Sequence, residues 1–262
     1  MQERHKDRKI YFQEQVQTSR TFYLDYVRRH MMLSASSRVL EVGCGEGGNL
    51  LPFAEMGCHV AGVDIKDEQV ERACRFFSEA GLSASFVASD FMALPAPETD
   101  DERFDVILVH DVIEHIEPPH KYQFVGHLKD FMRPDARVFF AFPAWQMPFG
   151  GHQQICHSRI SRLPYIHLLP VPLYRGLLRM THESEATIAE LLSIKRAKMP
   201  VERFERLVRR SGMTIEDKTY WLINPHYQQK FGLRPRGEVW PFTKCVWLRN
   251  FYTTSAWYMC SL

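Results

Sequence analysis

The stretch Arg38-Val-Leu-Glu-Val-Gly-Cys-Gly-Glu-Gly-Gly-Asn49 decides the fold, because an apolar strand containing an acid runs into a glycine cluster and then into a possible helix. Gly43 and Gly45 allow a sharp turn with no Cβ in the way, so backbone N–H groups and the next helix start can face a ligand. Together with Gly48 they also satisfy the G-x-G-x-x-G pattern of dinucleotide-binding loops. The glycines indicate a nucleotide-type cofactor without deciding which one.

Acidic residues accompany four successive apolar runs, and in order these are Glu41 within 38–42, Asp64 closing 59–64, Ser89-Asp90 after 85–88, and Asp111-Val-Ile-Glu-His115 after 104–110. A carboxylate inside the first strand suits an ammonium better than a pyrophosphate. An acid that closes the second strand lies where ribose hydroxyls are bound. These neighbours favour a cofactor that contains both an amino acid and a ribose.

With these ordered signals, residues 36–143 resemble the class I S-adenosylmethionine-dependent methyltransferases, a group that includes ubiquinone and menaquinone biosynthesis enzymes. The resemblance implies S-adenosyl-L-methionine as cofactor, with Glu41 at its methionine end, Asp64 on the ribose and Asp90 on the adenine amine. The whole cofactor-binding set that it implies is Glu41, Gly43, Cys44, Gly45, Asp64, Ile65, Ser89, Asp90, Phe91, His110 and Asp111. A sensor that binds S-adenosylmethionine without turnover and an NAD-dependent oxidoreductase are the alternatives.

Alternating periods predict an α/β fold. Helices are expected over 11–32, over 67–80 with Val70, Ala73, Cys74 and Phe77 on one face and Gly81 at its end, and around 124–131 before Pro134; a buried strand is expected at 138–142. This alternation predicts a Rossmann-like, doubly wound, mostly parallel sheet with its crevice at the strands' carboxyl ends. The family resemblance adds a sixth strand near 214–223 and an antiparallel seventh near 251–260.

We expect one domain over residues 1–262, with a cofactor-binding core at 33–143, a cap insertion at 144–199, and a helix and strands at 200–262. The insertion is too long for a plain connection, and a helix is expected near 184–195 within it. We expect it to cover the crevice together with the N-terminal helix and residues 224–241. Six cysteines without a C-x-x-C pair are expected to be buried thiols. Without an apolar run of membrane-spanning length or a leader-like start, a cytoplasmic location is expected.

Charge is divided unevenly along the chain. Residues 1–150 hold 16 Lys and Arg against 23 Asp and Glu, whereas residues 151–262 hold 17 against 8, and all five tryptophans follow position 143. This predicts a small acceptor with an anionic group and an apolar body, for which Arg234 and Arg236 are candidate contacts. A peripheral membrane contact also fits, whereas a pI of 8.2 is modest for a nucleic-acid-binding protein. Solvated surface charge is the alternative, and the oligomeric state is not predicted.

Methyl transfer needs alignment and, for a hydroxyl acceptor, one base. His152, in Phe149-Gly-Gly-His-Gln-Gln154, follows the fifth strand after a flexible Gly-Gly and is a candidate base, as is His115. Asp111, Glu114 and His115 have the i, i+3, i+4 spacing of one helical face that can bind a metal. The metal-free interpretation, in which Glu114 and His115 cap a helix, is preferred at this point.

Overall fold

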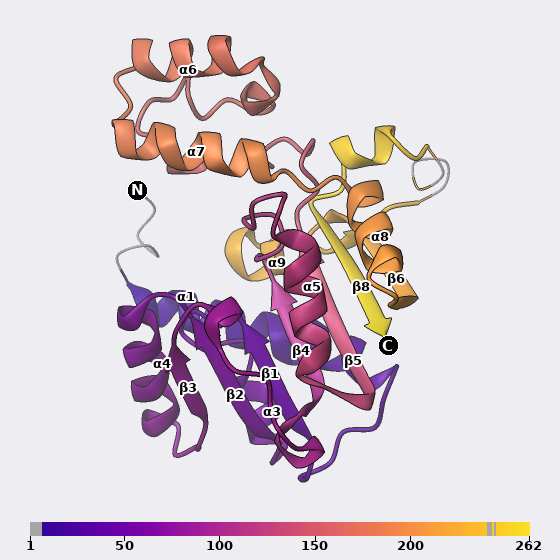
Figure 1. The fold of residues 1–262 in the computed structure, drawn as a ribbon. Coiled ribbons are helices and arrows are strands. Elements are labelled where there is room, and N and C mark those ends of the chain that lie inside the picture. Colours follow the sequence, from indigo (N-terminus) through magenta and orange to yellow (C-terminus); the bar gives the residue numbers. More distant parts are fainter. Residues whose placement is uncertain (1–6, 240–242, 244) are drawn as a thin grey trace.

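Eight strands form one sheet in the computed structural model, which describes residues 7–239, 243 and 245–262 (Figure 1). The strands are β1 (Arg38–Val42), β2 (His59–Asp64), β3 (Ser85–Ala88), β4 (Phe104–His110), β5 (Met132–Phe142), β6 (Thr214–Ile223), β7 (Arg236–Gly237) and β8 (Ser255–Ser261). Their order is β3-β2-β1-β4-β5-β8-β6-β7, and β1 to β5 pair in parallel. The Rossmann-like fold is thereby confirmed.

The predicted number of seven strands is wrong by one short strand. β8 lies antiparallel between β5 and β6, as expected for the last long strand. The additional strand is the two-residue β7, which pairs antiparallel with the free edge of β6. A strand this short has no sequence period, so it was not predictable from the pattern.

The helices of the described part are α1 (Arg8–Thr18), α2 (Leu24–Arg28), α3 (Leu51–Glu55), α4 (Asp67–Glu79), α5 (Lys121–Asp130), α6 (Val171–Met180), α7 (Glu185–Ala197), α8 (Val201–Arg210) and α9 (His226–Phe231). A π-helical turn at Ser19–Tyr23 joins α1 to α2, so the predicted N-terminal helix is continuous but not regular. Helix α6 is an addition to the predicted elements, and its start at Pro170-Val-Pro172 resembles a loop in the sequence. Proline is compatible with a first turn, where its missing N–H has no helical partner.

Pro134 does not end α5, contrary to expectation. The helix ends at Asp130, and Pro134 lies inside β5. The pairing of β5 with β4 shifts register between Phe104 and Val106, opposite this part of β5. An irregular stretch of this kind tolerates a residue without an N–H donor.

One cysteine was placed on the wrong side of α4. Cys74 is exposed, whereas Val70, Ala73, Phe76 and Phe77 are buried. The buried face is turned toward Phe76 because that ring packs on Phe12 of α1, with ring centroids 4.5 Å apart. Of the other cysteines, Cys245 is also exposed and the remaining four are buried; all six are free thiols.

Two hydrophobic layers lie on opposite faces of the sheet. Helices α1 to α4 cover one face, and α5 and α8 cover the other. Successive residues of a strand belong to different layers, as shown by Val106 and Ile107 of β4. Since β1 pairs with both β2 and β4, the strand order reverses there, and the crevice of such folds opens at this point.

The insertion between β5 and α8 has a small hydrophobic cluster of its own, made mainly by Tyr174 and Leu178 of α6 against Ile188, Leu191 and Leu192 of α7. Figure 1 shows α6 and α7 beyond the end of the sheet toward which β4 points, with α6 outermost. Within the described residues, no helix is long and apolar enough to cross a membrane.

Candidate active site

The glycine loop is fixed to the neighbouring strand by backbone hydrogen bonds. Gly43 and Cys44 N–H groups both donate to the Val63 carbonyl, at 2.7 and 3.0 Å. Gly43 and Gly45 have φ angles of 73° and 54°, in the left-handed region that glycine adopts without strain. The loop therefore turns sharply over the end of β1, as predicted. The next helix, α3, is a single short turn that begins only at Leu51, so its N-terminus is further from the loop than expected.

Glu41 presents an unsatisfied carboxylate at this turn. Its side chain is 1% exposed, and its Oε1 accepts a hydrogen bond of 2.7 Å from Asn49 Nδ2. No group of the described residues donates to its buried Oε2. Burial raises the pKa of Glu41 to about 8, which the Asn49 bond opposes and the charge of Asp64 reinforces. A buried carboxylate with one free oxygen is a site for a cationic donor.

The acids after β2 and β3 are held by backbone donors. Asp64 accepts from Gly45 N–H at 2.8 Å and from Lys66 N–H at 3.0 Å, and Asp90 accepts from Met92 N–H at 2.9 Å. Their remaining lone pairs are available for hydroxyl or amine donors. Ile65, beside Asp64, is 71% exposed, so its side chain is available for an apolar contact.

Phe91 and Ser89, two members of the expected cofactor-binding set, do not present free side chains to a cofactor. Phe91 is buried against Phe124 and Phe131, so its side chain belongs to the core and only its backbone faces the end of β3. The Ser89 hydroxyl donates to the Asp90 carbonyl at 3.2 Å. Both therefore support the turn that carries Asp90.

The predicted helical face of Asp111, Glu114 and His115 does not exist. These residues form turns, and α5 begins only at Lys121, so they do not cap a helix either. Asp111 has a φ of 53°, a conformation that turns it away from a helical path. Glu114 is buried, and neither of its carboxylate oxygens meets a donor in the part of the chain described. Burial and the charge of Asp111 hold the pKa of Glu114 well above its ordinary value.

His152 lies beside Glu114 and His115, although the sequence indicates His152 as a base and places the other two in a separate possible metal site. Ligand atoms of Glu114, His115 and His152 all lie within 4.8 Å of one another, and the two imidazoles meet edge to face with ring centroids 4.8 Å apart. Carboxylate and neutral imidazole are ligands of Zn²⁺ and other divalent metals. The three residues therefore fit a metal, and two of them follow β4 whereas the third follows β5, its neighbour in the sheet.

Two further observations bear on His152 as a base. Gly150 and Gly151 are buried, and a Cβ on either would collide with Trp145 or His167, so they are close-packing positions rather than a flexible hinge. Burial, reinforced by the neighbouring His115, lowers the pKa of His152 to about 4. A general base works best with a pKa near the operating pH, so this position suits a neutral ligand better than a base.

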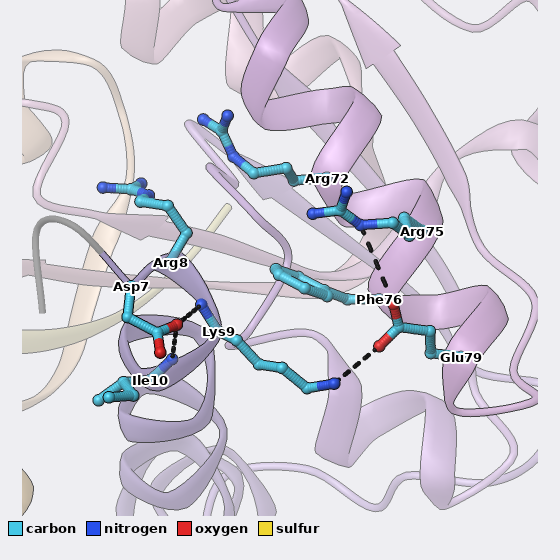
Figure 2. Close-up of a pocket in the computed structure, with 8 residues that line it drawn as sticks. All are labelled: Asp7, Arg8, Lys9, Ile10, Arg72, Arg75, Phe76 and Glu79. Carbon is cyan, nitrogen blue, oxygen red and sulfur yellow. Dashed lines mark hydrogen bonds and ion pairs between the residues drawn. The ribbon is translucent and has the colours of Figure 1, made fainter.

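The N-terminal helix is attached to the glycine loop by charge. Arg8 of α1 and Arg72 of α4 both donate to Oε1 of the buried Glu46, at 2.6 and 2.7 Å. Beside them lies an open pocket of about 690 Å³ between α1 and α4 (Figure 2). Lys9, another residue lining it, is paired with Glu79 at 3.0 Å. These pairs brace α1, which is their evident role.

The insertion contacts the loop that follows β4. Ser193 and Arg196 of α7 each donate to Glu117 at 2.9 Å, three residues beyond Glu114. Lys195 donates to the carbonyl of His167 at 2.6 Å. The insertion and the Glu114 loop are thus connected directly.

The expected positions of the tryptophans and arginines are only partly found. Trp257 is buried in the sheet layer, where it packs against Trp221, and Trp145 is buried against His167. Trp257 on β8 and Trp145, shortly after β5, are core residues, and Trp221 on β6 is partly buried against the same layer. Trp247 is exposed, and Trp240, like Pro241, lies outside the described residues. Arg234 and Arg236 are exposed, but Arg236 belongs to β7 rather than to a loop.

Comparison with known proteins agrees with this geometry. A family model described as a methyltransferase domain matches residues 39–135. A ubiquinone biosynthesis O-methyltransferase of Roseobacter denitrificans is 27% identical over 192 residues, covering 72% of this chain and 64% of that protein. One from Maricaulis maris is 33% identical over 109 residues, covering 38% and 41%. The chain thus spans less than two thirds of the length of these relatives.

Two solved structures share the fold at low identity. A methyltransferase from Clostridium acetobutylicum, described as S-adenosylmethionine-dependent, has a TM-score of 0.59 at 12% identity, covering 94% of this chain and 91% of that one. Magnesium protoporphyrin IX methyltransferase from Synechocystis, solved with SAH (S-adenosylhomocysteine), has 0.55 at 13%, covering 94% and 82%. The domain match and the fold agree: residues 39–135 match a methyltransferase domain, and the chain shares the fold of these solved methyltransferases.

Sequence reasoning missed Asn49 and Tyr23. Asn49 ends the quoted loop, and an amide eight residues after a buried acid was the available signal for their bond. Tyr23 donates or accepts a hydrogen bond of 2.8 Å with His110, 87 positions away. No local pattern announces a contact at that separation.

Proposed function

We propose that the protein transfers the methyl group of S-adenosyl-L-methionine to an oxygen or carbon atom of a small acceptor. The observation that carries this proposal is Glu41 Oε2, a buried carboxylate oxygen at the end of β1 without a donor among the described residues. The ammonium of the methionine end supplies such a donor. The similarity to ubiquinone biosynthesis O-methyltransferases supports an acceptor of the quinone or phenol type.

The chain's own residues bind and orient in this proposal. Bound S-adenosylmethionine supplies a methyl group on an electrophilic sulfonium. Glu41 neutralises the ammonium, Asp64 receives the ribose hydroxyls and Asp90 receives the adenine amine, with Ile65 covering the apolar side. Because Asp64 and Asp90 are already fixed by backbone donors, little ordering is needed when the cofactor binds. Alignment of this kind is the main requirement of the reaction.

Glu114, His115 and His152 would hold a divalent cation. Such an ion supplies a Lewis acid that lowers the pKa of a coordinated hydroxyl or phenol. The support for it is the pair of buried Glu114 oxygens without donors, next to two imidazoles. With a cation here, a hydroxyl oxygen is the favoured methyl acceptor, and no histidine is required as base.

The insertion, residues 144–199, is proposed as a cap that selects the acceptor within a single domain of residues 1–262. Residues 151–182 contain four arginines and no Asp or Glu. On α6, Leu173, Leu177 and Met180 have the i, i+4, i+7 spacing of one face, and Leu173 and Met180 are 62% and 71% exposed. Exposed aliphatic groups among cations support an acceptor with an anionic group and an apolar body, including a lipid-like acceptor at an anionic membrane surface.

The test is transfer of label from methyl-labelled S-adenosylmethionine to a cell extract, followed by identification of the labelled fraction. We expect a small-molecule fraction to carry the label, with transfer abolished by a chelator and restored by Mg²⁺ or Zn²⁺. Tight cofactor binding with no label transferred under any of these conditions would contradict an enzyme and favour a sensor. Label in nucleic acid or protein would contradict the acceptor class.

A further inference from the structure

The contact between Tyr23 and His110 joins the N-terminal segment to the centre of the site. Tyr23 Oη lies 2.8 Å from His110 Nε2, and the Tyr23 side chain is 1% exposed. The ring of Tyr23 packs on Phe139 and Trp257, with centroids 5.4 and 5.1 Å away. His110 is the last residue of β4, directly before Asp111. A fixed hydroxyl from α1–α2 therefore reaches the strand end beside the crevice.

The π-helical turn at Ser19–Tyr23 makes this reach possible. A π turn inserts an additional residue into a helix and changes the direction of the side chains that follow, and such turns are frequent at functional sites. At its start, the Ser19 hydroxyl donates to the Asn49 carbonyl at 2.7 Å, so the turn is attached to the glycine loop. At its end, Tyr23 meets His110. The irregular turn thus connects the cofactor loop with the end of β4.

The direction of the Tyr23–His110 bond follows from the second ring nitrogen. His110 Nδ1 lies 3.6 Å from Asp111 Oδ2. If Nε2 donated to Tyr23, the lone pair of neutral Nδ1 would face a carboxylate oxygen, and two acceptors would oppose each other. If Tyr23 donates to Nε2 instead, Nδ1 carries the proton and points it at Asp111. Burial and the charges of Asp111 and Glu41 hold the pKa of Tyr23 well above its ordinary value, which keeps its hydroxyl a donor.

We infer that Tyr23 is a positioning residue: it donates to His110, and His110 in turn presents its Nδ1 proton to Asp111, which holds that carboxylate toward the hydroxyl of the acceptor. Asp111 is exposed and has a left-handed φ, so neither packing nor a regular backbone fixes its carboxylate. It is also close enough to His115 and His152 for its charge to act on both. At 3.6 Å the His110–Asp111 contact is too long for a hydrogen bond, and the proposal requires it to shorten when the acceptor binds, as catalytic hydrogen bonds commonly do.

The catalytic consequence rests on the proposed methyl transfer, whereas the hydrogen-bond chain does not. Tyr23→Phe removes only the hydroxyl, and Tyr26→Phe is its matched control. Tyr26 is equally buried and packs on the same two rings, with centroids 5.4 and 5.5 Å from Phe139 and Trp257. Its hydroxyl is on the side of Asp217 rather than His110. Comparable melting temperatures of the two variants establish that both fold.

The first readout is the ¹⁵N NMR tautomer of His110, assigned with His110→Gln. We expect wild type and Tyr26→Phe to carry the proton on Nδ1, and Tyr23→Phe to lose this preference. The second is kinetic: turnover of the labelled acceptor should fall about 10- to 100-fold in Tyr23→Phe, with S-adenosylhomocysteine affinity unchanged. A proton on Nε2 in wild type, or equal turnover in the two variants, overturns the inference. Absence of turnover in wild type refutes the proposed function, and the NMR result then decides the Tyr23–His110–Asp111 chain by itself.

Discussion

The cofactor-binding core, residues 33–143, and the insertion, residues 144–199, hold their site residues in place in different ways. At the ends of β1 to β3, each acid is held by a donor close to it in the sequence or in the glycine loop: Glu41 by the Asn49 side chain, and Asp64 and Asp90 by backbone N–H groups. Near the insertion, the three candidate metal ligands come from separate turns, with Glu114 and His115 after β4 and His152 after β5. The first arrangement depends on local sequence. The second exists only when β4, β5 and the insertion are packed together.

This difference predicts which substitutions change cofactor binding alone and which change acceptor chemistry alone. A change at a strand-end acid should reduce cofactor binding without affecting the insertion. A change in the insertion should alter acceptor chemistry and leave cofactor binding intact. Each of the following predictions either separates the two regions or shows that they are coupled.

The largest effect is expected at Glu114. Glu114→Gln removes a charged ligand of the proposed cation. Turnover should therefore fall roughly 10³-fold, which corresponds to a loss of about 4 kcal/mol of transition-state stabilisation. Calorimetric titration with Mg²⁺ or Zn²⁺ should show the corresponding loss of metal binding. His120→Ala, an exposed histidine of the same loop, is the control and should retain both properties. Turnover that survives a chelator would remove the metal from the account.

The next effect is expected at Asp64. Asp64→Ala removes the carboxylate proposed to bind the ribose, and cofactor affinity should fall by roughly 2 to 3 kcal/mol, the size of paired charge-assisted bonds. The exposed Asp67, at the start of α4, provides the control variant Asp67→Ala. An Asp64 variant with the calorimetric affinity of wild type would sink the ribose assignment.

A smaller effect concerns the insertion alone and its dependence on pH. His167 is buried, its Nε2 lies 2.8 Å from the Trp145 carbonyl, and burial lowers its pKa to about 4. Between the unfolded value near 6.5 and about 4, the unfolded chain binds this proton and the folded chain does not. Stability should therefore fall as pH decreases through this window, by at most about 1.4 kcal/mol per pH unit from this residue.

Denaturant unfolding at pH 7 and pH 5 tests this. His167→Gln should have a shallower pH dependence than wild type, whereas His157→Gln, an exposed histidine of the same segment, should not. Identical pH dependence in wild type and His167→Gln would show that His167 is not the titrating group.

The smallest effect is expected at Arg234 and Arg236. These exposed side chains are proposed to attract an anionic acceptor, and contacts of this kind contribute up to about 1 kcal/mol. Replacing both by Ala should raise the acceptor KM about fivefold at low ionic strength, with little change at high salt. Arg206→Ala with Arg210→Ala, a pair of exposed residues on α8, is the control. An uncharged acceptor, or a KM that does not respond to the change, would show that the basic residues of 151–262 do not attract the acceptor.

The sequence predicted the strands of the cofactor-binding core, residues 33–143, because the information that defines them is local. Glu41, Gly43, Gly45 and Asp64 lie at strand ends whose apolar runs are unmistakable, and the order of signals defined the sheet. The same reasoning failed for Asp111, Glu114 and His115, since a spacing that fits a helix also fits successive turns. The sequence did not bring His152 and Glu114 together, because the register between β4 and β5 cannot be predicted from the sequence of either strand.

The π turn and the Tyr23–His110 contact were beyond sequence reasoning for a related physical reason. A helical period tolerates one inserted residue without losing its aromatic pattern, so the pattern over 11–32 predicts a regular helix. The exposed face of Cys74 has the same origin, because the position of α1 on α4 decides which neighbour is buried. Long-range packing settled each of these points.

Calorimetric titration of S-adenosylhomocysteine into wild type, Glu41→Gln and Glu114→Gln tests the division between the two regions most directly. We predict that wild type binds, that Glu41→Gln binds at least about tenfold more weakly because the ammonium loses its charged partner, and that Glu114→Gln binds within about twofold of wild type. At pH 7, binding to wild type should release a proton from Glu41, whose pKa is about 8 in the free protein, and this release should be absent in Glu41→Gln. Equal affinity in wild type and Glu41→Gln, or a loss confined to Glu114→Gln, would contradict the account.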